Sequence, residues 1–162
     1  MTVWGGVFIG ISASGGLGDN HPGQWAPFWR EACQAGRPYA CPYLADLSLQ
    51  YCDRGSGWGC NEAGLLHVAL ARSGEDLRRS NLADAAAPFR KGCSVGFAAA
   101  CRNLDELSRG GNAFSAPPPG LADYPVILQG SKGPLRETDA AALLPLACAQ
   151  GWKAACAAEP RF

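Results

Sequence analysis

Apolar residues recur at helical spacing in the segment that leads up to the first cysteine. In residues 25–33 they occupy positions i, i+3, i+4 and i+7, which are Trp25, Phe28, Trp29 and Ala32. That spacing places them on one face of an α-helix. The segment therefore predicts a helix that ends close to Cys33.

Two later segments are organised in the same way. Residues 80–93 begin with Ser80, a residue type that favours helix N-caps, and carry two basic residues near their end, where a helix favours positive charge. Residues 138–148 lead up to a further cysteine with a similar apolar run. Because Pro88 and Pro145 lie inside these segments, we expect a kink or a late start in both helices.

Apolar pairs also follow three of the cysteines, at the third and sixth positions after each one. The pairs are Leu44 and Leu47, Ala63 and Leu66, and Leu104 and Leu107. This spacing predicts one buried face per helix, with the residue seven places after each cysteine beside that face. Those residues are Ser48, His67 and Ser108. Helices before and after the cysteines predict an all-α chain.

The eight cysteines themselves form a repeat. They lie in four pairs that each enclose seven residues, at Cys33 and Cys41, Cys52 and Cys60, Cys93 and Cys101, and Cys148 and Cys156. Each pair has a glycine three places after its first cysteine, at Gly36, Gly55, Gly96 and Gly151. Each also has a small residue directly before its second cysteine, at Ala40, Gly59, Ala100 and Ala155. The pattern C-x2-G-x3-[AG]-C thus occurs four times.

This spacing predicts disulfide-closed corners between helices. In one unbroken helix, residues eight apart are separated by about 12 Å along the axis, whereas a disulfide needs its two Cα atoms within roughly 4.4–6.8 Å. A glycine in the left-handed conformation ends a helix and lets the chain turn back. The predicted pairs are therefore Cys33–Cys41, Cys52–Cys60, Cys93–Cys101 and Cys148–Cys156.

The arrangement resembles the cysteine-rich branch of the Sel-1-like repeats, which includes the Helicobacter cysteine-rich proteins. The best copy of the repeat runs from Cys60 to Cys93 and keeps the family's small, apolar and basic positions at Ala63, Gly64, Leu66, Gly74, Phe89 and Lys91. His67 stands where the family has tyrosine. The resemblance covers residues 24–156 and implies an α/α solenoid of tetratricopeptide-like helix pairs. The chain ends on half a repeat, so the last disulfide is expected to cap the array.

The spacing of the repeats defines the expected domains. Residues 1–23 form an apolar, turn-rich segment, and residues 24–162 form the helical repeat domain. The longest gap between repeats contains residues 110–136, with three consecutive prolines at 117–119. We expect this stretch to be an inserted, irregular loop. Loops of such length are often functional or mobile.

Composition and charge exclude some classes of protein. The 162 residues carry 14 basic and 14 acidic side chains, so neither net charge nor a local basic cluster favours a nucleic-acid partner. No stretch approaches the roughly 20 apolar residues that cross a bilayer. Residues 3–13 are apolar and are open to two interpretations: the stub of a signal or membrane helix, or a buried first element packed on Trp25 and Trp29.

Eight paired cysteines in a small chain indicate an oxidising compartment, the periplasm or another extracytoplasmic location. The alternative is eight reduced thiols that pack as small apolar residues. A metal site is not expected, because zinc sites favour shorter cysteine spacings with histidine partners. No cofactor is expected either, since the glycine fingerprints of nucleotide sites and the haem-attachment motif are missing from the sequence.

The sequence offers little for catalysis. His21 lies in a turn-rich stretch and His67 lies near an apolar helix face. Neither the nucleophile-elbow motif nor the S-x2-K, S-D-N and K-T-G motifs of serine β-lactamases occur. β-Lactam binding or hydrolysis is therefore an alternative that rests on family resemblance only, and we expect a protein that is not an enzyme.

We expect instead a scaffold that binds protein or peptide ligands along the inner surface of a solenoid. Aromatic residues occupy the corner of each repeat, at Tyr39, Trp58, Phe97 and Trp152. Most are expected to pack on neighbouring helices, and one or two to anchor a partner. Trp58, Asn61, His67 and Asn103 are the candidate binding residues. A further alternative is the extracytoplasmic domain of a larger, membrane-tethered protein.

Overall fold

The computed structural model describes residues 22–73, 82–128 and 143–158, and all regular structure in them is helical. The helices are α1 (Pro22–Gln34), α2 (Ala40–Asp53), α3 (Gly57–Ser73), α4 (Ala83–Ser94), α5 (Ala98–Ser108), the 3₁₀ turn η2 (Leu121–Asp123), α6 (Tyr124–Ile127), α7 (Leu144–Ala149) and α8 (Lys153–Ala158). The predicted all-α class is confirmed. Residues 3–13 and His21, on which the sequence left questions open, lie outside the described residues.

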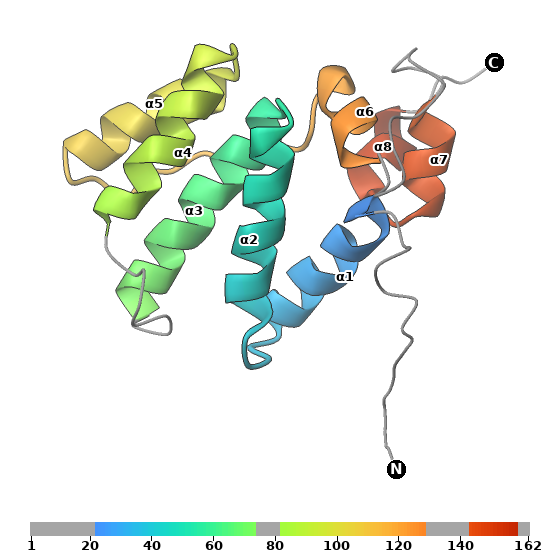
Figure 1. The fold of residues 1–162 in the computed structure, drawn as a ribbon, viewed down its shortest axis with the longest axis horizontal. Coiled ribbons are helices and arrows are strands. Elements are labelled where there is room, and N and C mark those ends of the chain that lie inside the picture. The colour runs from blue at the N-terminus through green and yellow to red at the C-terminus, as the bar shows by residue number, and fades with distance from the viewer. Residues whose placement is uncertain (1–21, 74–81, 129–142, 159–162) are drawn as a thin grey trace.

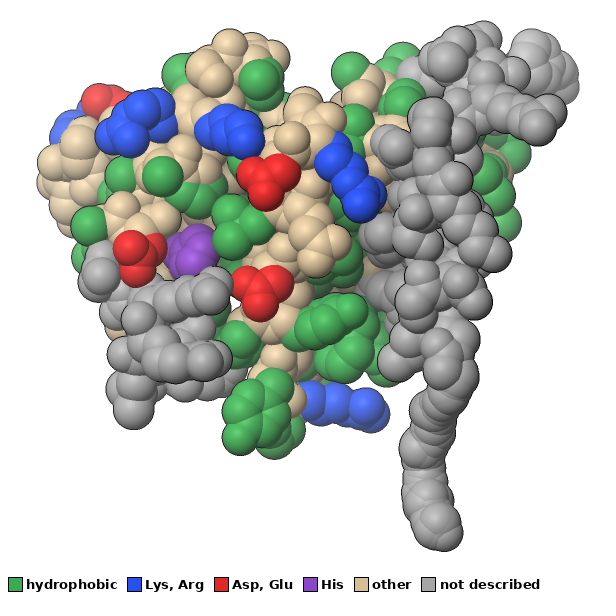
Figure 2. Space-filling view, viewed as in Figure 1, with side chains coloured by type: hydrophobic (Ala, Val, Ile, Leu, Met, Phe, Trp, Pro, Cys, Tyr) green, Lys and Arg blue, Asp and Glu red, His purple; other side chains and the backbone are tan. Residues whose placement is uncertain are grey.

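Helices α1 to α5 follow one another across the molecule in chain order (Figure 1). Each packs against the next, and α3 also contacts α5. The short gap between the first two disulfides holds the single helix α2, as the spacing predicts. Acidic and basic side chains are interspersed on the face drawn in Figure 2, which agrees with the balanced charge.

The chain then returns to its beginning. An extended segment leaves α5, and α6, α7 and α8 lie beside α1 (Figure 1). One hydrophobic cluster joins α1, α2 and α3 to the later helices, with Ala26, Leu47, Tyr51 and Trp58 on one side and Tyr124, Ile127, Leu144, Ala147 and Trp152 among the residues on the other. The last disulfide, which the sequence predicts to cap the array, joins α7 and α8, and these helices pack beside α1.

The four corners share one backbone geometry. Each first cysteine is the next-to-last residue of its helix. The glycine three places later has a positive φ, between +78° and +104°, and the residue after it donates its N–H to the carbonyl five residues back. That bond is the 6→1 hydrogen bond of a Schellman helix end. The predicted role of the glycine is thus confirmed at Gly36, Gly55, Gly96 and Gly151.

These corners bring each pair of cysteines together. The Cα atoms of the four pairs are 4.6, 4.4, 4.5 and 4.6 Å apart, and all four predicted disulfides are formed. The small residue before each second cysteine is buried. At Gly59 an added Cβ would lie 2.6 Å from the Cβ of Tyr51 and 3.0 Å from the backbone nitrogen of Cys52. The small residue therefore lets two helices touch beside the disulfide.

Several expectations are corrected. Residues 121–127, expected within an irregular loop, form η2 and α6, while residues 129–136 of that loop lie outside the described residues. Phe28, expected on a buried face, is 46% exposed, and Ser108, expected next to an apolar stripe, is exposed to solvent. The expected late start is found at α7, where Pro145 occupies the first turn, whereas Pro88 lies within α4.

Among the helices described, none combines the length and the apolar character that crossing a bilayer requires.

Candidate functional site

Two buried asparagines hold the extended segment that follows α5. Asn61 of α3 and Asn103 of α5 are both fully buried, and the Nδ2 of Asn103 donates to the Oδ1 of Asn61 at 2.7 Å. Both side-chain amides also donate to the carbonyl oxygen of Ser115, at 3.1 and 2.8 Å. The N–H of Ser115 donates in return to the Oδ1 of Asn103 at 2.7 Å. Two side chains thus satisfy both main-chain groups of one residue.

The residue before Ser115 is an aromatic anchor. Phe114 packs on the cluster formed by Val68, Ala85 and Phe89, and its ring stacks on that of Phe89 with centroids 6.1 Å apart. The guanidinium of Arg72 lies over the Phe114 ring, 5.5 Å from its centroid, a distance that suits a cation–π contact. Phe114 therefore fixes the side-chain register of the segment, as Ser115 fixes its main-chain register.

We call residues 111–120 the strap. It has no regular secondary structure, and each of its residues is exposed or half-buried. The strap crosses the helix layer from the end of α5 toward η2, so it lies on the surface of the helices rather than within them. Its contacts through one aromatic side chain and one main-chain unit are those by which proteins bind extended peptides.

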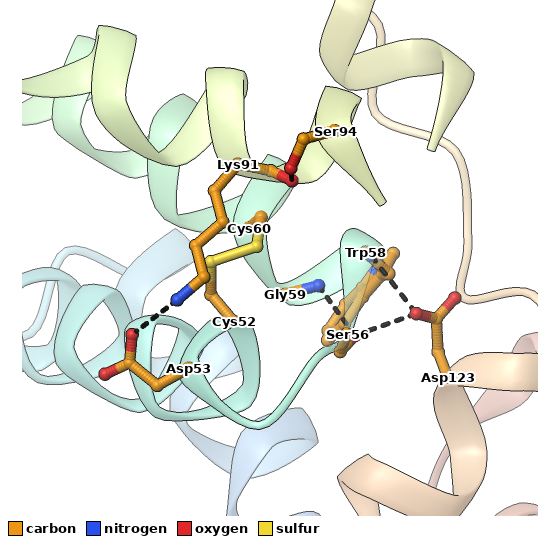
Figure 3. Close-up of a disulfide and its surroundings, with 9 residues drawn as sticks. All are labelled: Cys52, Asp53, Ser56, Trp58, Gly59, Cys60, Lys91, Ser94 and Asp123. Atoms are coloured by element: carbon orange, nitrogen blue, oxygen red, sulfur yellow. Dashed lines mark hydrogen bonds and ion pairs between the residues drawn. A yellow bond between two sulfur atoms is a disulfide. The ribbon is translucent and has the colours of Figure 1, made fainter. Parts of the chain in front are cut away.

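The end of the strap is joined to the second corner by Asp123 (Figure 3). The Oδ1 of Asp123 accepts hydrogen bonds from the hydroxyl of Ser56 at 2.8 Å and from the N–H of Trp58 at 3.2 Å. Its Oδ2 accepts the N–H of Gly120 at 2.8 Å. Ser56 Oγ in turn accepts the N–H of Gly59 at 2.9 Å. A carboxylate at the start of α3 is favourable, because the first N–H groups of a helix lack intrahelical partners.

A cleft of about 670 Å³ opens beside the strap, where α1, α3 and α8 meet. Its apolar lining includes Trp58, Trp152 and the three strap prolines at 117–119, and its polar lining includes Arg30, Glu31 and Lys153. Trp58 and Trp152 are buried and pack edge to face at 5.2 Å. The cleft therefore combines an aromatic floor, a proline wall and charges of both signs.

A partly buried ion pair supports the floor of the cleft. Arg30 donates to Glu62, whose side chain is 8% exposed while that of Arg30 is 41% exposed. The Arg30 guanidinium also lies 5.6 Å from the centroid of Trp58. Burial raises the pKa of Glu62 above its usual 4.5, and the charge and hydrogen bond of Arg30 act in the opposite direction. Arg30 is thus held in place at the mouth of the cleft by a carboxylate and a ring.

The four candidate binding residues from the sequence lie at three separate places in the structure. Asn61 and Asn103 lie together and hold the strap, and Trp58 forms the cleft floor. His67 is 7% exposed, and its Nδ1 has no hydrogen-bond partner among the described residues. The corner aromatics pack as expected at Trp58 and Trp152, while Tyr39 is 82% exposed.

Sequence reasoning missed Arg30, Glu62, Phe114, Ser115 and Asp123. Arg30 and Glu62 are 32 positions apart, and Asp123 is 67 positions from Ser56, so no helical or strand periodicity relates them. The Pro-rich stretch was the one available signal, since it marked the segment as an inserted loop.

Three comparisons were made with known proteins, and no family model, curated protein or solved structure matches this chain. The resemblance to Sel-1-like repeats therefore stays a prediction. Four disulfides indicate that the protein folds in an oxidising environment. The described residues contain no group of three His, Cys, Asp or Glu side chains arranged for a metal ion.

Proposed function

We propose that this chain is an exported helical-repeat scaffold of the Sel-1-like type that binds protein or peptide ligands and has no catalytic activity of its own. The observation that carries the proposal is the cleft of about 670 Å³ between α1, α3, α8 and the strap. That volume lies within the usual range of about 300–1,000 Å³ for ligand sites.

The lining of the cleft favours a peptide over a purely apolar ligand. Phe28, which is 46% exposed, lines the cleft together with the largely buried Trp58 and Trp152, and aromatic residues dominate binding energy at protein interfaces. Arg30, Glu31 and Lys153 offer both a positive and a negative partner, which suits the mixed polar groups of a peptide. Glu62 and Trp58 hold the guanidinium of Arg30 in position.

The redox state of the cysteines supports the proposed export. The described residues include every cysteine of the chain, and all eight are paired in disulfides. A periplasmic or other extracytoplasmic location supplies the oxidising environment. Tethering to a membrane through a segment outside the described residues belongs to the same proposal, as does a place in a larger membrane protein.

Hydrolysis of β-lactams, the alternative suggested by family resemblance, is not favoured by any arrangement in the described residues. The side chains that line the cleft in this part of the chain are Pro, Phe, Arg, Glu, Gln, Trp, Lys and Ala. These groups bind ligands, whereas acyl transfer to an enzyme requires an activated nucleophile such as Ser or Cys.

The test is a peptide selection against the oxidised protein. Peptides selected from a random 12-residue library are labelled with fluorescein, and their affinity is measured by fluorescence anisotropy. Ala154, on α8, lines the cleft, so Ala154→Trp fills it. Ala98, exposed at the start of α5, provides the matched control Ala98→Trp outside the cleft.

We expect the selected peptides to bind Ala154→Trp at least tenfold more weakly than the unmodified protein, and Ala98→Trp within twofold. Equal binding to both variants, or a selection that yields no binding peptide, would contradict the proposed function.

A further inference from the structure

The strap meets the helices as a bound peptide meets its receptor. Its main chain is held at Ser115 by the paired amides of Asn61 and Asn103. Its side-chain anchor is Phe114, which rests on Phe89 under the guanidinium of Arg72. Its prolines at 117–119 then form a wall of the cleft. A single extended segment therefore spans an aromatic pocket, a main-chain clamp and the cleft.

We propose that the surface beneath the strap is a second peptide site, which accepts an extended segment of a partner protein in place of residues 111–120. This proposal rests on the proposed function, in that it takes the helix layer to be a peptide-binding surface. The partner segment has an aromatic residue at the position of Phe114, a small residue at that of Ser115 and prolines two to four positions later. It lies in the same direction as the strap.

The contacts of the strap define which partner segment the site would accept. The hydrogen bonds that Asn61 and Asn103 make to the strap go only to the main chain of Ser115, so they set direction and register but accept any small side chain. The pocket formed by Val68, Ala85 and Phe89 is apolar and takes the ring of Phe114. The cation over that ring favours an aromatic residue over an aliphatic one, because the face of an aromatic ring is electron-rich.

The strap is suited to exchange because it is held on one side only. Phe114 is half-buried, and Ala113, Ala116 and Pro118 are exposed. Removing the strap exposes two fully buried asparagine side chains that need hydrogen-bond partners, and a peptide main chain supplies the same donor and acceptor. The strap is also tethered at both ends, which gives it a high effective concentration at the site. A free peptide therefore competes poorly until the anchor of the strap is weakened.

The experiment uses a synthetic peptide with the sequence of residues 111–120, GNAFSAPPPG, labelled with fluorescein. Its affinity is measured by anisotropy for the oxidised, unmodified protein and for Phe114→Ala, in which the strap has lost its anchor. Two matched controls accompany it. One is the peptide GNAASAPPPG, which lacks the aromatic ring, and the other is the double variant Phe114→Ala with Asn103→Ala, which lacks the clamp.

We expect Phe114→Ala to bind the peptide at least tenfold more tightly than the unmodified protein does. The peptide without phenylalanine, and the variant without Asn103, should each lose at least tenfold of that affinity. If Phe114→Ala keeps its helical circular dichroism and four disulfides but binds no better than the unmodified protein, the strap is a permanent structural element and the proposal is wrong.

Should Phe114→Ala fail to fold, Ser115→Pro replaces it, because proline removes the N–H that Asn103 accepts and leaves the helices untouched. If both variants fail to fold, the strap is integral to the fold and the proposal is likewise overturned. This experiment and the Ala154→Trp experiment can fail independently of each other. Ala154 lies in the cleft and is not part of the Phe114 pocket.

Discussion

The corners closed by Cys52–Cys60 and by Cys148–Cys156 have the same local structure and different surroundings. Their Cα separations are 4.4 and 4.6 Å, and Gly55 and Gly151 both have φ near +100°. Yet Cys52 and Cys60 are 2% and 0% exposed, whereas Cys156 is an exposed residue.

The corner closed by Cys52–Cys60, which we call the central corner, is surrounded by contacts with distant parts of the chain. Besides the close approach at Gly59, an added Cβ at Gly92 of α4 would lie 3.0 Å from the Cβ of Cys60. Asp123 accepts hydrogen bonds from Ser56 and Trp58 at the same corner (Figure 3). The terminal corner joins two helices of six residues each. One sequence motif thus determines the shape of both corners, and the packing around each determines how much it stabilises the protein.

The largest expected effect comes from removing the disulfides themselves. Replacing Cys52 and Cys60 by alanine together removes the loop constraint, worth about 2.6 kcal/mol, and leaves space where two buried sulfurs were, so we expect a loss of about 4 kcal/mol. The pair Cys148 and Cys156 should cost about 2.6 kcal/mol, because its loop has the same length and one sulfur is exposed. Urea unfolding of the two double variants measures the difference, and equal losses would show that burial does not separate the corners.

A second, smaller effect tests the contact between the returning chain and the central corner. Asp123→Ala leaves the hydroxyl of Ser56 and the N–H of Trp58 without their acceptor in a buried place, and we expect a loss of about 2 kcal/mol. The control is Asp53→Ala at the same corner, where the aspartate is 74% exposed and pairs with Lys91. That exposed pair should contribute less than about 0.5 kcal/mol. Similar unfolding midpoints for the two variants would argue against a role of Asp123 in joining the parts.

The smallest expected effect concerns the carboxyl group of Glu62, which is buried in α3 two residues after Cys60. Because the pKa of Glu62 is raised in the folded protein, the native state binds this proton more tightly than the unfolded chain does. Stability contributed by the protonated form is therefore lost as pH rises from about 4.5, the ordinary value, through the native pKa. Relative to Glu62→Gln, the unmodified protein should become less stable over that interval and then stay level.

The measurement is the difference in urea midpoint between the unmodified protein and Glu62→Gln at pH 4, 5, 6 and 7. If the urea midpoint of the unmodified protein rises relative to that of Glu62→Gln as the pH rises, or keeps a constant offset from it, Arg30 outweighs burial at this carboxyl.

The disulfide pairs and the helices on either side of them could be predicted from sequence, because each depends on residues within one or two turns of helix. The candidate site could be predicted only in part. Trp58, Asn61 and Asn103 were found from their position in the repeat, but their partners Trp152, Arg30 and Ser115 lie in other elements. The inserted stretch was recognised from its prolines, while its course over α3 and α5 was not.

By itself, then, the sequence determined the four corners. A glycine tolerates positive φ, a small residue allows close helix contact, and a separation of eight positions brings two cysteines within bonding distance once the chain turns. These are properties of local backbone geometry. Only the tertiary structure decided that the chain returns to α1, that the strap is held by Asn61 and Asn103, and that Arg30 meets Glu62 across 32 positions. Such contacts depend on which apolar faces bury each other best, and periodicity along one helix does not specify its partner.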